Sequence, residues 1–255
     1  MNRMVQRINL PGLACMAALV LLWEIFSRTV GARLDTIPSV SAILIALYQL
    51  VSDGALLSQL GHTVLVSVAG WLIASAVGLT AGLVIGLWRP VWTYSMASID
   101  VLRSIPSISL ISIALLLFGF SSKMEMVIVV YVSQWPVLLA TASAVGATPR
   151  SYLDSARVLR LSQRATVMKV RIPAALPSIL VGVRLALTLS IALAVVAEMV
   201  GNPAGLGFGI VYAQQAIQPA QAFAYLLVIG LIGWALNAAL MAAVERFLNV
   251  HTVTP

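Results

Sequence analysis

Two long stretches without a charged residue constrain the fold of this chain most. Gly54–Trp88 runs for 35 residues and Met199–Val244 for 46 residues without an Asp, Glu, Lys or Arg. Over the whole chain, 61% of residues are hydrophobic and 9% are charged, whereas soluble domains carry charge on about 25% of their residues. The composition therefore excludes an ordinary soluble protein and predicts a chain that lies in a lipid membrane.

The apolar segments favour membrane-spanning helices over the strands of a barrel. A spanning helix needs about 20 mostly apolar residues, whereas barrel strands alternate polar and apolar positions over about 10 residues. Val64–Leu87 and Met126–Ala140 are apolar on nearly every side. Since lipid offers the backbone no hydrogen-bonding partner, we expect an all-α membrane protein, a bundle of six transmembrane helices forming one domain over residues 1–255. The predicted spans are 11–29, 62–88, 100–119, 125–147, 175–199 and 222–244.

The N-terminal part of the sequence leaves two alternatives open. Arg3 and Arg7 precede the first apolar run, which is also the pattern of a signal peptide, but no polar domain follows, so an uncleaved first helix is the simpler interpretation. Pro38–Leu50 is apolar but too short to span. Ser39 and Ser41 are helix-start signals, so this segment predicts a short helix, either at the membrane interface or in a packed loop.

The distribution of Lys and Arg predicts the orientation. With the N-terminus inside, three basic residues lie outside, namely Arg28, Arg33 and Lys123. The other twelve of fifteen lie on the cytoplasmic side or at the adjoining helix ends: Arg3, Arg7, Arg89, Arg103, Arg150, Arg157, Arg160, Arg164, Lys169, Arg171, Arg184 and Arg246. This asymmetry predicts that both termini lie in the cytoplasm. It also accounts for the net charge of +7 without a nucleic-acid partner.

Small residues recur every fourth position in the second predicted span. Gly70, Ala74, Gly78, Gly82 and Gly86 form a ridge along one helix face, which lets another backbone approach closely. The ridge predicts a packed bundle and carries no information about function.

No cofactor or metal motif is found in the sequence. Gly205, Gly207 and Gly209 follow no predicted strand and lack the dinucleotide-binding spacing, so we interpret them as turn glycines. Cys15 is the single cysteine, and no Cys/His spacing resembles a metal site. We therefore expect this chain itself to bind no cofactor.

Polar residues within the predicted spans are few. Arg103 beside Pro106, and Gln134, either line a translocation pathway or serve the fold, since lipid would penalise them. Arg103 can also pair with the acidic side chain three residues before it. For Arg184 and Glu198, which lie toward opposite ends of one span, structural pairing or snorkelling is the favoured interpretation.

The only strongly charged segment is Arg150–Arg171, between the fourth and fifth spans. Thr148-Pro149 is the pattern of a helix cap followed by a first-turn proline, and Ser162 is a second helix start. An amphipathic stripe then closes at Pro173; its members are Leu161, Ala165, Met168 and Ile172. The pattern predicts a helix–bend–helix at the membrane surface, whose arginines could also simply bind anionic headgroups.

This segment resembles a known family signature. Asp154-Ser155-Ala156, then Arg160, then Val170-Arg171-Ile172-Pro173 is similar to the EAA signature of permease subunits of binding-protein-dependent ABC importers: Glu-Ala-Ala, three residues, Gly, nine residues, Ile-x-Leu-Pro. The spacing matches throughout, with Asp for Glu, Ser for the first Ala and Arg160 for Gly. Further motifs look like the nitrate/sulfonate/taurine branch: Arg103-Ser-Ile-Pro106, Phe118-Gly119-Phe120 with Ser122-Lys123, Ala174-Ala-Leu-Pro177, Gly182-Val-Arg184, Ala197-Glu198-Met199 and Gly205-Leu-Gly207.

The resemblance implies a subunit of a larger assembly in the bacterial inner (cytoplasmic) membrane. Its partners would be a second permease copy, a periplasmic solute-binding protein and cytoplasmic ATPase subunits, which use ATP-Mg. The chain has no phosphate-binding Gly-x-x-x-x-Gly-Lys-Ser/Thr loop, in agreement with ATP hydrolysis elsewhere. By resemblance, the loop 149–173 would couple the permease to the ATPase. The residues implied are Asp154, Ser155, Ala156, Arg157, Arg160, Leu161, Ser162, Ile172 and Pro173.

The family glycine falls at the bend between the two loop helices. A left-handed backbone there would strain an L-residue, so Arg160 predicts a right-handed conformation, with the bend displaced toward Leu161-Ser162.

Two other function classes would also use a helical membrane bundle. A secondary transporter or channel should show membrane-embedded acids or internal repeats, and Asp100 and Glu198 lie near span ends. An intramembrane enzyme needs a catalytic constellation, and the two histidines, His62 and His251, lie at a span edge and in the C-terminal tail. The sequence therefore favours the importer permease and leaves the solute open.

Overall fold

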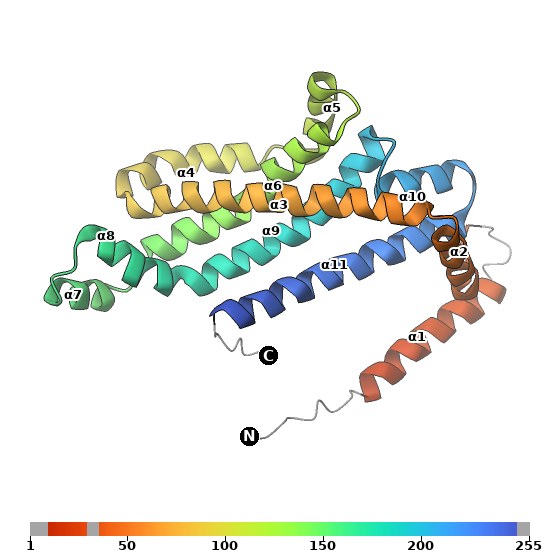
Figure 1. The fold of residues 1–255 in the computed structure, drawn as a ribbon, viewed down its shortest axis with the longest axis horizontal. Coiled ribbons are helices and arrows are strands. Elements are labelled where there is room, and N and C mark those ends of the chain that lie inside the picture. Colours follow the sequence, from red (N-terminus) through yellow and green to blue (C-terminus); the bar gives the residue numbers. More distant parts are fainter. Residues whose placement is uncertain (1–9, 30–35, 249–255) are drawn as a thin grey trace. The chain divides into compact units, whose positions relative to one another are not determined.

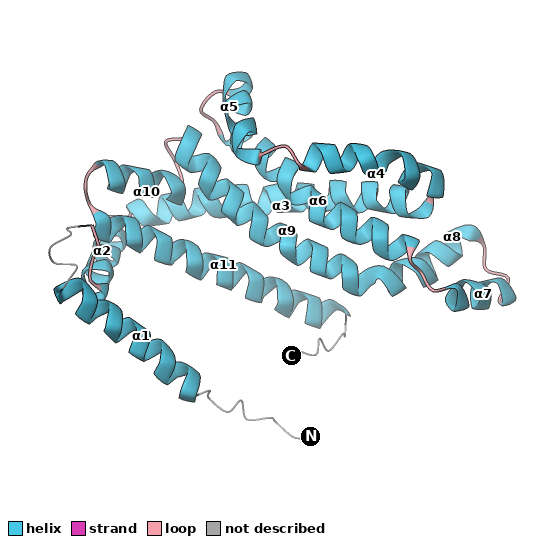
Figure 2. Ribbon diagram, turned by 180° about the vertical axis from the view of Figure 1, so that it is seen from behind, coloured by secondary structure: helices cyan, strands magenta, loops and turns pink. Residues whose placement is uncertain are grey.

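The computed structural model describes residues 10–29 and 36–248, so Arg3, Arg7, Arg33 and His251 lie outside the described residues. The described residues form helices joined by loops, with no strand among them (Figure 2). The chain divides into two compact units, Met1–Leu57 with Gly209–Val228 and Ser58–Phe208 with Ile229–Pro255.

Five helical runs in the described part are long and apolar enough to cross a membrane. They are α1 (Leu10–Thr29), α3 (Ala55–Leu87), α6 (Ser122–Gly146), the run α8 (Gln163–Thr166), η2 (Val167–Arg171) and α9 (Ile172–Gly201), and α11 (Pro219–Leu248). A sixth span can be made by the bent pair α4 (Arg89–Arg103) and α5 (Ser107–Phe118). The shorter helices are α2 (Val40–Ser52), α7 (Arg150–Val158) and α10 (Leu206–Gln215). The all-α membrane fold expected from the sequence is confirmed.

The third predicted span, 100–119, differs from the observed helices. Helix α4 begins eleven residues earlier than predicted, ends at Arg103, and meets α5 at an angle of 82°. Pro106 lies in the break between the two helices. A proline disfavours helical geometry in the residue before it, so α4 does not continue into α5. The hydroxyl of Tyr131 in α6 donates to the carbonyl oxygen of Leu102 at 2.6 Å and fixes the end of α4.

In the first unit, α2 is held against α1 by hydrogen bonds. The Ser39 hydroxyl accepts from the Ala42 N–H and caps α2, as predicted. The Glu24 carboxylate accepts from the Ser41 N–H and hydroxyl and from Arg28. The short helix predicted from Pro38 onward therefore exists.

In the second unit, the small-residue ridge of α3 packs against α6. A Cβ added at Gly78 would lie 2.6 Å from the Gln134 carbonyl oxygen, and one added at Gly82 would lie 2.7 Å from the Leu138 carbonyl oxygen. A Cβ added at Gly86 would lie 2.6 Å from the Ala142 carbonyl oxygen. Backbone contact this close is possible only without a side chain. The predicted ridge is confirmed as a packing surface, and it brings α3 onto the central part of α6.

Helices α6 and α9 run side by side through the second unit, and α7 and α8 lie together at one end of them (Figure 1). Gly182 of α9 lies against the Pro136 carbonyl and Ala140 of α6. The indole N–H of Trp71 in α3 donates to the Val183 carbonyl at 2.9 Å. The core of this unit is therefore built from α3, α6 and α9.

The predicted helix end at Pro173 is wrong, because Gln163–Gly201 forms one run of 39 residues. Pro173 lacks an N–H and its ring collides with the carbonyl one turn earlier in a regular α-helix. The wider π-helical turns of η2 immediately precede it, at Val167–Arg171. The chain thus passes from the charged segment into the membrane span without a break.

Candidate functional site

The predicted charged loop is a helix–bend–helix, as expected. Helix α7 begins after Pro149, and Thr148 does not cap it, because its hydroxyl donates to the Val145 carbonyl instead. The predicted Thr148 cap is therefore wrong by one residue. The Ser162 cap is confirmed, since its hydroxyl accepts from the Ala165 N–H at 3.2 Å.

The predicted right-handed conformation of Arg160 is wrong. Its φ is 53°, in the left-handed region. The Leu161 N–H donates to the Ala156 carbonyl at 3.0 Å and the Arg160 N–H to the Arg157 carbonyl at 2.9 Å, which is the Schellman ending of a helix. These two hydrogen bonds end α7 and outweigh the strain of a non-glycine residue in this conformation. The bend therefore stays at the family position rather than moving to Ser162.

The loop carries apolar side chains that the sequence analysis did not single out. Tyr152, Val158 and Leu159 are 54%, 83% and 70% exposed. Asp154 and Arg157 are also exposed and form an ion pair of 2.8 Å. Of the implied residues, Ala156 is buried, Leu161 and Ile172 are half-buried, and Asp154, Ser155, Arg160, Ser162 and Pro173 are exposed. The loop thus presents a mixed apolar and charged surface, which suits contact with another protein.

The predicted pathway residues are not brought into direct contact with one another. The Arg103 guanidinium donates to Asp100 at 2.9 Å, and both side chains are about half exposed. The Gln134 amide is half-buried and donates to the Tyr131 carbonyl at 3.3 Å. Arg103 therefore has the alternative partner considered from the sequence, and a pathway role for Arg103, Pro106 and Gln134 stays a prediction.

A buried polar cluster joins the ends of α3, α6 and α9. His62 Nε2 lies 2.8 Å from Glu125 Oε2, and Glu125 is fully buried. The Asn202 amide donates to the other Glu125 oxygen. Glu198, only 1% exposed, accepts from the Thr63 hydroxyl at 3.0 Å and from the Gly207 N–H at 2.9 Å. Hydrogen bonds of this kind hold helix ends together where no water can satisfy the polar groups.

This cluster is a place where a metal ion could be held. His62, Glu125 and Glu198 each offer one ligand atom within 4.8 Å of the others. Hydrogen bonds from neighbouring groups already occupy both oxygens of Glu125 and one oxygen of Glu198. We interpret the cluster as a connection between helices. This cluster was not predicted from the sequence. The available signal is that His62, Glu125 and Glu198 all fall at or next to ends of predicted spans on the same side of the membrane.

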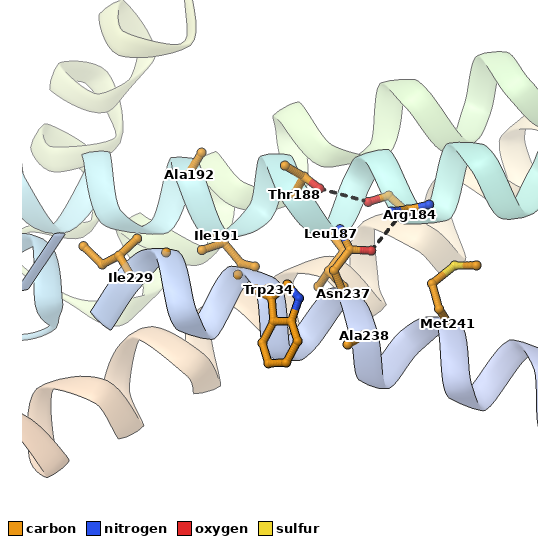
Figure 3. Close-up of a pocket in the computed structure, with 12 residues that line it drawn as sticks. Arg184, Leu187, Thr188, Ile191, Ala192, Ile229, Trp234, Asn237, Ala238 and Met241 are labelled. Atoms are coloured by element: carbon orange, nitrogen blue, oxygen red, sulfur yellow. Dashed lines mark hydrogen bonds between the residues drawn. The ribbon is translucent and has the colours of Figure 1, made fainter. Parts of the chain in front are cut away.

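A groove of about 430 Å³ lies between α9 and α11 in the second unit (Figure 3). Arg184 of α9 donates through Nε to the Asn237 side-chain oxygen of α11 at 2.9 Å. Thr188 and Trp234 are exposed beside them. Structural pairing or snorkelling was the interpretation favoured from the sequence for Arg184 and for Glu198. The structure pairs Arg184 with Asn237 and places Glu198 in the buried cluster.

Comparisons with known proteins agree with this architecture. Residues 74–248 match the family described as binding-protein-dependent transport system inner membrane component. An ABC transporter permease protein of Methanocaldococcus jannaschii is 30% identical over 96% of this chain and 92% of its own length. An aliphatic sulfonates transport permease of Bacillus subtilis is 26% identical, covering 88% and 81% of the two chains.

Two further similarities extend the comparison. A bicarbonate transport permease of Synechococcus elongatus is 31% identical over 68% of this chain and 64% of its own. The structure is similar to that of the MetNI methionine ABC transporter in inward-facing conformations, with a TM-score of 0.59 and 19% identity, over 73% of this chain and 95% of that chain. The last similarity concerns the fold alone.

Proposed function

The chain belongs to the family of binding-protein-dependent transport system inner membrane components, and on that premise we propose how its parts serve import. It is a multi-pass permease subunit of an ABC importer of the cytoplasmic membrane, and ATP hydrolysis resides in a separate subunit. ATPase subunits and a solute-binding protein are the partners that this membership implies. This membership therefore excludes a secondary transporter and an intramembrane enzyme.

The α7–α8 loop is the proposed docking site for the ATPase. The observation that carries this proposal is the exposure of Tyr152, Val158 and Leu159 beside the Asp154–Arg157 pair. A water-facing helix end with no partner rarely presents three large apolar side chains together. The Schellman ending at Arg160 presents Val158 and Leu159 on a fixed backbone, which reduces the entropy lost on docking.

The proposed solute is a small oxyanion. The relatives described above are named as permeases for aliphatic sulfonates and for bicarbonate. No acidic residue lines the α9–α11 groove, which holds Arg184. An anion is therefore the solute class that agrees both with the relatives and with the charge of this groove.

Two features of the assembly complete the proposal. The termini lie in the cytoplasm, because this orientation leaves only three of the fifteen basic residues, Arg28, Arg33 and Lys123, on the outer side. Two copies form the translocation pathway, and exposed apolar surface such as that of Leu226, Leu231 and Trp234 on α11 is available to lipid or to the second copy.

The docking proposal is tested with charge substitutions in the loop. Val158→Glu with Leu159→Glu should lower recovery of the ATPase with the purified permease at least about ten-fold, because burying two carboxylates in an interface is strongly unfavourable. Asp154→Lys should lower solute-stimulated ATP hydrolysis in reconstituted membranes, since it reverses a charge at the same surface. Both sites are exposed, so the permease itself should remain folded.

Ser122→Glu is the matched control, because it adds a carboxylate at the exposed first residue of α6, at the opposite end of that helix from the loop. An acid at a helix N-terminus is tolerated, so this variant should retain the ATPase. Retention of the ATPase at the wild-type level by the loop variants would overturn the docking proposal.

A further inference from the structure

Arg184 lies deep within a membrane span. It follows the first residue of α9, Ile172, by twelve positions, which is about 18 Å along the helix, and Asn237 precedes the last residue of α11, Leu248, by eleven positions, about 17 Å. The hydrocarbon core of a membrane is about 30 Å thick. Both side chains therefore lie at a similar depth, near the middle of their spans.

The charge of Arg184 is not neutralised within the described part of the chain. The guanidinium uses Nε for the neutral side-chain oxygen of Asn237. No carboxylate among the described residues pairs with it, and its two terminal nitrogens have no hydrogen-bond partner there. The residue is exposed at the surface of the chain. An arginine at this depth with free donors requires either a partner or water, since lipid provides neither.

The surrounding groups present donors. Because the Asn237 oxygen accepts from Arg184, its amide NH₂ is left to donate, beside the terminal guanidinium nitrogens. Figure 3 shows Arg184 beside Asn237 of α11 and Thr188 of α9, with Trp234 farther along α11 in the same groove. Two planar donor groups side by side suit the oxygens of a small oxyanion, which guanidinium binds in a bidentate manner.

The size of the groove agrees with such a ligand. Its volume of about 430 Å³ falls in the range of small-molecule sites, about 300–1,000 Å³. The glycines Gly230 and Gly233 of α11 line it without a side chain. The remaining wall is mostly apolar, which strengthens the attraction between the guanidinium and an anion by excluding water.

We propose that Arg184 and Asn237 form an anion-binding site between α9 and α11, which holds the oxyanion of the solute within the membrane. This inference rests on the proposed function, since it assigns to the imported oxyanion a place in the permease. The site is distinct from Arg103, whose charge is paired with Asp100.

The test uses the complete importer in proteoliposomes and in detergent. Asn237→Asp places a carboxylate beside the guanidinium and should lower uptake of labelled nitrate, bicarbonate and ethanesulfonate at least about ten-fold, because the internal ion pair replaces the anion. Arg184→Gln should have the same effect, and Arg184→Lys should retain part of the uptake. Gln221→Glu, which adds a carboxylate to the first turn of the same helix α11, should leave uptake unchanged.

A direct binding measurement separates the site from transport. Iodide quenches indole fluorescence on contact, and Trp234 lines the groove. The contribution of Trp234 is the part of the quenching that Trp234→Phe lacks. In the wild type this part should reach a plateau as the iodide concentration rises. In Arg184→Gln it should rise linearly with iodide concentration, without a plateau. Loss of this saturation in the variant supports the site, and equal saturation in both overturns it.

The two proposals fail in distinguishable ways. If Asn237→Asp and Arg184→Gln import an oxyanion at the wild-type rate, the site is wrong and the proposed solute class stands. If iodide binding depends on Arg184 but the wild type imports none of the three oxyanions, the site stands and the proposed solute class is wrong.

Discussion

Arg160 adopts a backbone conformation that usually belongs to glycine. Its φ of 53° ends α7, and the side chain is exposed. The left-handed region costs an L-residue about 1–2 kcal/mol, whereas glycine adds about 0.5–1 kcal/mol of entropy loss on folding. The free-energy cost of the strain at Arg160 is therefore larger than the free-energy cost of the entropy that glycine would lose on folding.

Arg160→Gly should raise the stability of the permease by about 0.5–1 kcal/mol, because relief of strain exceeds the added chain entropy. Thermal unfolding of the purified protein in detergent measures the change. Leu159→Gly is the matched control. With φ of −77° the neighbouring residue is unstrained, so glycine there should lower stability by a similar amount. A fall in stability for Arg160→Gly as large as that for Leu159→Gly would contradict the strain.

At the scale of the helices, the contact between α3 and α6 depends on missing side chains. A Cβ at Gly82 would lie 2.7 Å from both the Leu138 carbonyl oxygen and the Thr141 Cβ. Backbone atoms cannot move aside as a flexible side chain can, so the whole helix would have to shift. Gly61 on the same helix has no atom within 4 Å of an added Cβ.

Gly82→Ala should therefore lower stability by about 1–3 kcal/mol through overpacking. Gly61→Ala should raise it by about 0.5–1 kcal/mol, because alanine favours the helix and meets nothing. Thermal unfolding of both variants in the same detergent provides the comparison. Equal effects of the two substitutions would show that α3 and α6 are not in close contact at Gly82.

The sequence predicted the helices better than the bends and helix ends that connect them. Apolar length was enough to locate α3, α6, α9 and α11, and the Ser162 cap needs only its local pattern. The π-helical turns before Pro173 and the Schellman ending at Arg160 depend on which hydrogen bonds form, and a residue pattern does not specify these. The contact between His62 and Glu125 joins residues 63 positions apart, so only the packing of α3 on α6 reveals it.

For the whole molecule, the orientation in the membrane determines which partner each end meets. Ser155 and Ser122 are exposed, the first in α7 and the second at the opposite end of α6. If the basic residues lie inside, α7 lies in the cytoplasm and Ser122 on the other side.

In a Cys15→Ser background, Ser122→Cys should react with a membrane-impermeant maleimide added to intact spheroplasts. Ser155→Cys should react only after the membrane is permeabilised. Both cysteines are exposed, so the difference reports their side of the membrane rather than their burial. Reaction of Ser155→Cys in intact spheroplasts would overturn the orientation and the ATPase-docking role together.

The unbroken helical run Gln163–Gly201 connects the charged loop to the opposite end of the bundle. From Gln163 to Glu198 it measures about 53 Å, and at Glu198 it is pinned by hydrogen bonds from Thr63 and Gly207. A tilt of only about 5° about that pin would displace the far end beside α7 by roughly 5 Å, the rise of one helical turn. If the run tilts as one unit, a small angular change at the pinned end produces a large displacement at the loop, and no residue between them has to unfold.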